Sequence, residues 1–146
     1  MRGMANNLQC VPVMAPMDVT LAWTGDLAFS LTAGAHSLVT DGDGKAGISP
    51  VQMLCGALAG CMGTDVALIL TRGRQDLRAL DVTLRATRAE QEPRRILAVT
   101  IHFAVKGQVN QAQLDRAIAL SREKYCSVWH SLRDDITLET TTSIDA

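Results

Sequence analysis

Two cysteines in unlike settings are the residues of this sequence that could do chemistry. Cys61 lies in the middle of a long, almost uncharged segment, residues 49–66, and Cys126 lies at a break between two helical patterns. A thiol can be oxidised to a sulfenic acid, and two neighbouring thiols can be oxidised to a disulfide. The pair therefore points to thiol redox chemistry if the fold brings the two sulfur atoms together.

Local sequence favours Cys126 as the more reactive thiol of the pair. It follows Arg122 and Lys124 and lies where amides of the next helical segment are exposed, and both features stabilise a thiolate. A buried thiol at a helix cap is the equally open alternative. On local grounds Cys61 is more often a small core residue, and Cys55, about 240° around the same predicted helix, is assigned to the core.

The size and charge of the chain limit the function classes. Its 146 residues, 47% hydrophobic and 20% charged, suit one globular domain, which we place at residues 17–146 behind a flexible extension at residues 1–16. A net charge of −1 and a pI near 6.3 give no general attraction to nucleic acid or anionic lipid. We therefore predict no nucleic-acid partner.

The four cysteines contain no CxxC pair, which argues against a structural zinc site. We predict no bound metal and no cofactor. Pro12 and Pro16 interrupt the weak apolar stretch near the N-terminus, which argues against a secretory signal and for the cytoplasm. The segment 50–71 is long and apolar enough to cross a membrane. Gln52, Thr64 and the strand-like remainder instead favour a helix buried in protein.

Hydrophobic periodicity predicts an α+β fold with antiparallel sheets around a long buried helix. Ser49 and Pro50 mark the start of that helix, and Gly73 marks its end. Because the helix is apolar or small on all sides, something must cover its far side, and the simplest cover is a second copy of the chain, which predicts a homodimer. The other elements are strands at 17–23, 27–32, 36–40, 81–90, 95–106 and 135–144, and helices from 110 or 111 and at 127–133.

Two motifs resemble the OsmC/Ohr superfamily, which comprises osmotically inducible protein C and the organic hydroperoxide resistance proteins. The first is Ser-Pro-Val-Gln-Met-Leu at residues 49–54, followed by Ala-Leu-Ala-Gly-Cys at 57–61 and Asp-Val at 65–66. The second is Glu-Lys-Tyr-Cys-Ser-Val at residues 123–128. The resemblance extends over residues 17–144 and is closest to the OsmC-like branch rather than to Ohr proper.

The resemblance implies an intertwined homodimer and a thiol-dependent peroxidase with a role in the stress response. By this analogy Cys61 attacks an organic hydroperoxide and becomes a sulfenic acid, and Cys126 condenses with it to a disulfide that an external dithiol reduces. The substrate-binding slot is expected to be lined by Gln52, Met53, Leu54, Leu58 and Met62.

The residues that activate the cysteine in well-known members have no evident counterparts. Ala28 stands where an arginine is expected, and Val51 and Gln52 stand where a glutamate is expected. A free thiol with a pKa of about 8.5 is only about 3% ionised at pH 7, and Asp65, one turn on, would raise that pKa. The missing cation is predicted to be Arg122, Lys124, an arginine of the hairpin 85–95, or a partner residue.

The missing activators favour a second hypothesis beside the peroxidase. In it, a non-catalytic dimer of the same fold binds or senses a small apolar or thiol-containing molecule between its subunits. A purely structural stress protein is the third and weakest hypothesis. Thiol oxidation by a hydroperoxide separates the first hypothesis from the other two.

Overall fold

The computed structural model describes residues 13–146. Most of the predicted N-terminal extension and Cys10 therefore lie outside the described residues. The chain divides into two compact units, one ending at Ile48 and the other spanning Ser49–Ala146, and each is described by itself.

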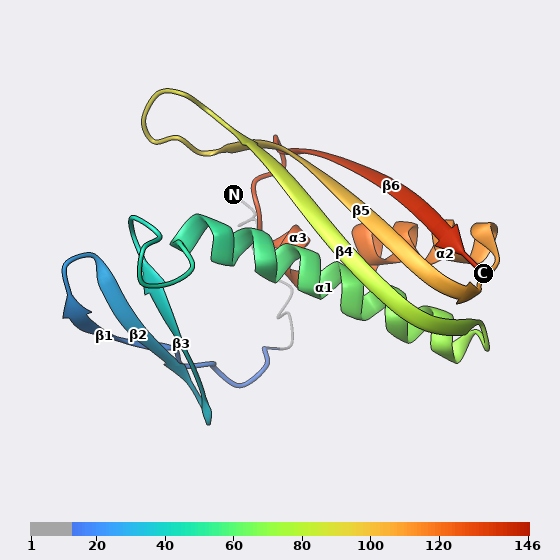
Figure 1. The fold of residues 1–146 in the computed structure, drawn as a ribbon, viewed down its shortest axis with the longest axis horizontal. Coiled ribbons are helices and arrows are strands. Elements are labelled where there is room, and N and C mark those ends of the chain that lie inside the picture. The colour runs from blue at the N-terminus through green and yellow to red at the C-terminus, as the bar shows by residue number, and fades with distance from the viewer. Residues whose placement is uncertain (1–12) are drawn as a thin grey trace, which may run out of the picture. The chain divides into compact units, whose positions relative to one another are not determined.

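The first unit is a three-stranded antiparallel sheet in the order β1-β2-β3 (Figure 1). Its strands are β1 (Thr20–Gly25), β2 (Ala28–Ala33) and β3 (His36–Asp41). Gly25 and Asp26 make the first turn with positive φ angles of 121° and 45°, and Gly34 takes a φ of 59° in the second. The three predicted strands are confirmed, although the first begins at Thr20 rather than at residue 17.

The second unit begins with α1 (Pro50–Arg72), the predicted central helix. Ser49 Oγ accepts the backbone N–H of Gln52 at 3.3 Å, and Gln52 Oε1 accepts the backbone N–H of Ser49 at 3.0 Å. This reciprocal capping box, with Pro50 in the first turn, satisfies amides that have no partner inside the helix. The start and the end of the helix are confirmed.

A second sheet has the order β4-β5-β6, with β4 (Asp76–Arg88), β5 (Ile96–Gln108) and β6 (Thr137–Asp145). The hairpin of β4 and β5 is antiparallel as predicted, but β6 runs parallel to β5, so the expectation of purely antiparallel sheets is wrong. Between β5 and β6 the chain forms α2 (Gln111–Leu120), a π-helical turn (Ser121–Tyr125) and α3 (Ser127–His130). Parallel strands need such a helical crossover to return to the same end of the sheet.

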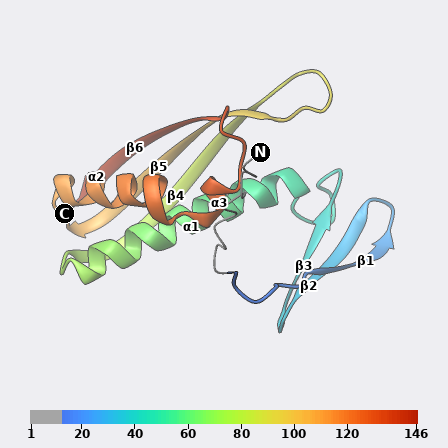
Figure 2. The ribbon, with the colours of Figure 1, turned by 180° about the vertical axis from the view of Figure 1, so that it is seen from behind.

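One face of this second sheet is buried, and α1 and α2 both pack against that face (Figures 1 and 2). The helix α1 is buried along one stripe only, while Leu54 and Leu68 outside that stripe are about 40% and 45% exposed, so the described residues leave part of its apolar surface uncovered, as expected from the sequence. It is long and apolar enough to span a membrane, yet its stripe belongs to this core. The core residues are Leu58, Met62, Val66, Leu70, Ile96, Val99, Ile101, Phe103, Val105, Val109, Leu114, Ala117, Ile118, Cys126, Ile136 and Leu138.

Candidate active site

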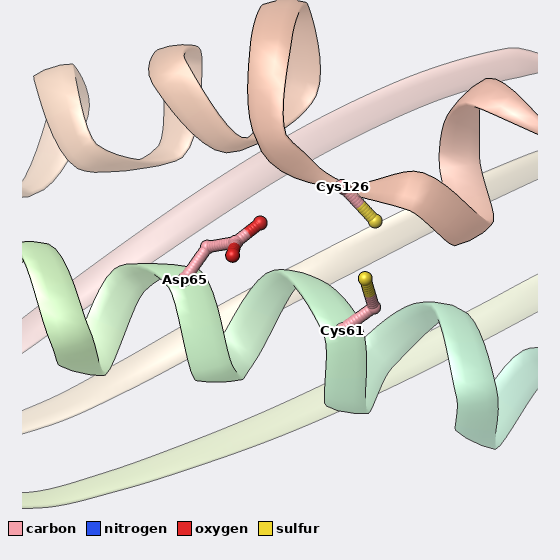
Figure 3. A group of neighbouring side chains, drawn as sticks. All are labelled: Cys61, Asp65 and Cys126. Carbon is pink, nitrogen blue, oxygen red and sulfur yellow. The ribbon is translucent and has the colours of Figure 1, made fainter. Parts of the chain in front are cut away.

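The second unit brings Cys61 and Cys126 together across 65 residues of sequence. Cys61 projects from the middle of α1, and Cys126 lies between the π-helical turn and α3. The two sulfur atoms and a carboxylate oxygen of Asp65 lie within 4.8 Å of one another. Figure 3 shows the two sulfur atoms facing each other, with Asp65 one helical turn away on the same face of α1.

The π-helical turn fixes the backbone of Cys126. The Cys126 N–H donates to the carbonyl oxygen of Ser121 at 2.8 Å, and the helix stops there because Cys126 takes an extended conformation. Its sulfur then caps α3 by accepting the N–H of Trp129 at 3.3 Å. The predicted break between two helical patterns is therefore real. A single π turn inside a helix is often found at functional sites.

Hydrogen bonds make Cys61 the more acidic thiol. Partial burial raises its pKa, but the Val128 amide together with the side chains of Cys126 and Ser127 outweighs this and lowers the pKa below its ordinary value. Ser127 Oγ lies 4.0 Å from the Cys61 sulfur. Cys61 is half-buried, whereas Cys126 is fully buried.

Burial makes Cys126 the less acidic thiol. Its side chain is fully buried, and this desolvation raises its pKa to about 11 even though the Trp129 amide opposes the shift. The expectation that neighbouring basic residues favour the Cys126 thiolate is therefore wrong, and the alternative of a buried thiol at a helix cap is confirmed. Arg122 and Lys124 are exposed, and the Lys124 ammonium lies 5.3 Å from the centre of the Tyr125 ring. Although Arg122 and Lys124 are close to Cys126 in sequence, neither is among the groups that shift the pKa of its thiol.

Asp65 is held by Ser121, whose hydroxyl donates to its carboxylate at 2.8 Å. As expected, its charge raises the pKa of Cys61, although less than burial does. The groups that lower this pKa are an amide, a thiol and a hydroxyl, none of them a cation. Arg88 of the hairpin acts on Cys55, whose pKa is raised by burial and lowered in part by that arginine.

The five residues expected to line one substrate slot are not gathered around a single cavity. Leu54 lines a cavity of about 320 Å³. Leu58 and Met62 are buried in the core, Met53 is half-buried, and the side chain of Gln52 is engaged in the helix cap. The cavity is lined by six apolar residues, four arginines and one serine: Val51, Leu54, Pro93, Ile96, Leu132 and Ile136, with Arg88, Arg94, Arg95 and Arg133, and Ser131.

Three contributors to the site were not found from the sequence. These are the Ser127 hydroxyl, the Val128 amide and the Ser121 hydroxyl, which touch Cys61 or hold Asp65. The signal for the first two was available, because they directly follow Cys126 at the start of a helix. A signal for Ser121 was available too, because it lies on the same helical stripe as the buried residues Leu114, Ala117 and Ile118.

We expect iodoacetamide to alkylate Cys61 before Cys55 and Cys126 near neutral pH. The thiolate is the reacting form, and only Cys61 of these three has a pKa below the ordinary value, so its rate should rise with pH and reach half its maximum below the midpoint of free cysteine. Peptide mapping at a series of pH values measures this. A midpoint at or above that of free cysteine would contradict the described hydrogen bonding.

Comparison with known proteins relates this geometry to one family. A family model described as OsmC-like protein matches residues 42–141. Protein YhfA of Escherichia coli K12 is 38% identical over 115 residues, which cover 77% of this chain and 86% of YhfA. The crystal structure of a hypothetical protein from Aquifex aeolicus VF5 has a TM-score of 0.84 at 25% identity, with 90% of this chain and 98% of that chain covered.

A more distant solved structure has the same fold. It is an organic hydroperoxide resistance protein OsmC from Legionella pneumophila, with a TM-score of 0.67 at 15% identity. The similarity covers 90% of this chain and 99% of that one. At this level of identity the likeness establishes the fold alone.

Proposed function

This chain belongs to the OsmC-like family, and from that premise we propose that it is a thiol-dependent peroxidase that reduces organic hydroperoxides with Cys61 and Cys126. The observation that carries the proposal is the approach of the two sulfur atoms to within 4.8 Å. Members of the same fold that are named organic hydroperoxide resistance proteins support the choice of substrate class.

In the first step the Cys61 thiolate attacks the terminal oxygen of the hydroperoxide. The O–O bond breaks, a proton goes to the departing alkoxide, and the products are an alcohol and a Cys61 sulfenic acid. The hydrogen bonds from Val128, Cys126 and Ser127 prepare Cys61 for this step because they favour its thiolate.

In the second step the Cys126 sulfur attacks the sulfenic sulfur of Cys61 and water leaves. A disulfide needs an S–S bond of about 2.05 Å, so the two sulfur atoms must approach by about 2.8 Å at most. An external dithiol then reduces the disulfide by thiol exchange. Such reductants are available in the cytoplasm, where we place the protein.

The cavity beside Leu54 supports an organic substrate. Leu54 precedes Cys61 by seven residues, which is almost two turns, so both lie on one side of α1 about 10.5 Å apart along its axis. The apolar residues of its lining can bury a hydrocarbon tail while the peroxide group reaches toward Cys61. Its volume of about 320 Å³ lies at the lower end of the range of about 300–1,000 Å³ for small-molecule pockets.

Stopped-flow thiol counting tests the proposal. Reduced protein mixed with cumene hydroperoxide should lose two thiols per chain. Burial of the aromatic tail is worth about 1.5–3 kcal/mol, so cumene hydroperoxide should react about tenfold or more faster than hydrogen peroxide. Thiol loss no faster than for free cysteine at the same pH would contradict the proposal.

We infer that the protein acts as a homodimer. Large apolar side chains are exposed in both units, including Trp23 at 68% and Leu68 at 45%, and a second copy of the chain is the simplest cover for them. Sedimentation at micromolar concentration should give twice the chain mass of 15.7 kDa. A stable monomer would contradict the inference.

One observation favours a second candidate, a non-catalytic dimer that senses or binds a small apolar or thiol-containing molecule. The groups that lower the pKa of Cys61 include no cation, and Ala28 and Gln52 replace the residues expected to activate it. In this case the protein should bind apolar ligands but consume hydroperoxide no faster than free thiols. The stopped-flow measurement separates the two functions.

A further inference from the structure

Asp65 is the one charged residue of the thiol cluster, and the proposed peroxidase reaction does not use it. Its carboxylate disfavours the Cys61 thiolate on which that reaction depends. Among residues 13–146, the ion pairs involve Asp43, Asp76, Glu92 and Asp135, and Asp65 is in none of them. The described partner of Asp65 is a neutral hydroxyl, that of Ser121. A half-buried carboxylate beside two thiols therefore lacks a described positive charge.

The arrangement of the three side chains suits a metal cation. Cys61 and Asp65 are four residues apart on α1 and so project from the same face, and Cys126 faces them from the segment before α3 (Figure 3). The three donor atoms lie within 4.8 Å of one another. Tetrahedral zinc, with Zn–S bonds of about 2.3 Å and Zn–O bonds of about 2.0–2.2 Å, requires donors about 3.4–3.8 Å apart. Side-chain rotations that shorten each separation by at most about 1.0–1.4 Å provide that spacing.

We propose that the reduced protein binds one Zn²⁺ per chain through Cys61 Sγ, Cys126 Sγ and an Asp65 carboxylate oxygen. Two thiolates and a carboxylate match the borderline-soft character of zinc better than that of calcium or magnesium, which prefer all-oxygen sites. The hydrogen bond that the Ser121 hydroxyl donates to one oxygen of Asp65 fixes the orientation of the carboxylate and leaves the other oxygen available. A water molecule completes the tetrahedron.

Zinc at this position makes the availability of the thiols depend on the metal. Both sulfur atoms bind as thiolates, so binding releases protons in proportion to the thiols that were protonated. While the ion is bound, neither sulfur is free to attack an electrophile. This consequence does not depend on the peroxidase reaction, because it concerns binding to the reduced protein alone.

Titration of the reduced protein with Zn²⁺ tests the site, with a phosphine reductant in place of chelating dithiols. We expect one ion per chain, proton release into a weakly buffered solution, and protection of two thiols from a disulfide reagent. The Co²⁺ form should show thiolate-to-metal charge transfer and the visible bands of tetrahedral cobalt. Alkylation of Cys61 and Cys126 should abolish all of these signals.

The decisive variant is Asp65→Asn, which keeps the shape of the side chain and removes its charge. It should weaken zinc binding by at least about 10–100-fold, because losing a group that merely orients a ligand already costs that much and Asp65 is itself a ligand. Glu123→Gln is the matched control, because it removes the same charge from an exposed residue three positions before Cys126 and should leave the affinity unchanged. Equal affinity for native and Asp65→Asn protein, or no stoichiometric binding to the native protein, would overturn the proposal.

Discussion

Replacement of Cys61 by serine should abolish hydroperoxide-dependent thiol oxidation, with a loss on the order of 10³-fold or more in the rate of peroxide consumption. Cys61 has the more acidic of the two facing thiols, and a hydroxyl at this position cannot supply the sulfur nucleophile or form a sulfenic acid. Loss of the nucleophile removes the whole covalent route rather than one stabilising contact. Stopped-flow peroxide consumption and thiol counting measure the effect.

Cys55→Ser is the matched control for this experiment. Cys55 lies on the same helix, and burial raises the pKa of its thiol, but it does not belong to the thiol cluster. The variant should consume hydroperoxide at the native rate and still lose two thiols per chain. If Cys61→Ser remains active while Cys55→Ser does not, the nucleophile has been misassigned.

Replacement of Cys126 by serine should leave the first oxidation intact and stop the cycle after it. Cys61 would still reduce one equivalent of hydroperoxide, but its sulfenic acid would lack the neighbouring sulfur that condenses with it. Excess peroxide should then carry Cys61 on to sulfinic and sulfonic acid, which mass spectrometry detects as the addition of further oxygen atoms.

Two quantities distinguish this outcome from general damage to the site. The burst of the Cys126→Ser variant should equal one hydroperoxide per chain, and steady turnover with a dithiol should fall far below the native rate. The Cys126 side chain also caps α3 through Trp129, and serine can accept the same amide hydrogen bond. Normal cycling by this variant would mean that another thiol resolves the sulfenic acid.

The sequence sufficed to predict the elements that carry the two cysteines. Ser49 and Pro50 determine the start of α1, and the break before Ser127 was visible as a change of helical pattern. Both are local signals, since a helix cap or a break depends on a few consecutive residues. Resemblance to a family then supplied the pairing of Cys61 with Cys126, which no local pattern contains.

The predictions about thiol acidity and about the pairing of β6 were wrong because both properties depend on contacts between residues far apart in the sequence. The acidity of Cys61 depends on hydrogen bonds from Val128 and Ser127, more than 60 residues away, whereas Cys126 loses acidity through burial despite its basic neighbours. The parallel pairing of β6 likewise follows from the crossover through α2 and α3 rather than from the alternation of the strand itself. Gln52 was expected to line the substrate slot, but its side chain accepts the backbone N–H of Ser49 in the N-terminal cap of α1.

Disulfide mapping after exposure to one equivalent of organic hydroperoxide tests most directly the claim that the sulfur atoms of Cys61 and Cys126 react with each other. Non-reducing peptide digestion and mass spectrometry should find one intrachain disulfide, Cys61 to Cys126, with Cys10 and Cys55 still reduced. A disulfide through Cys10 or Cys55, a bond between chains, or no disulfide at all would contradict the account.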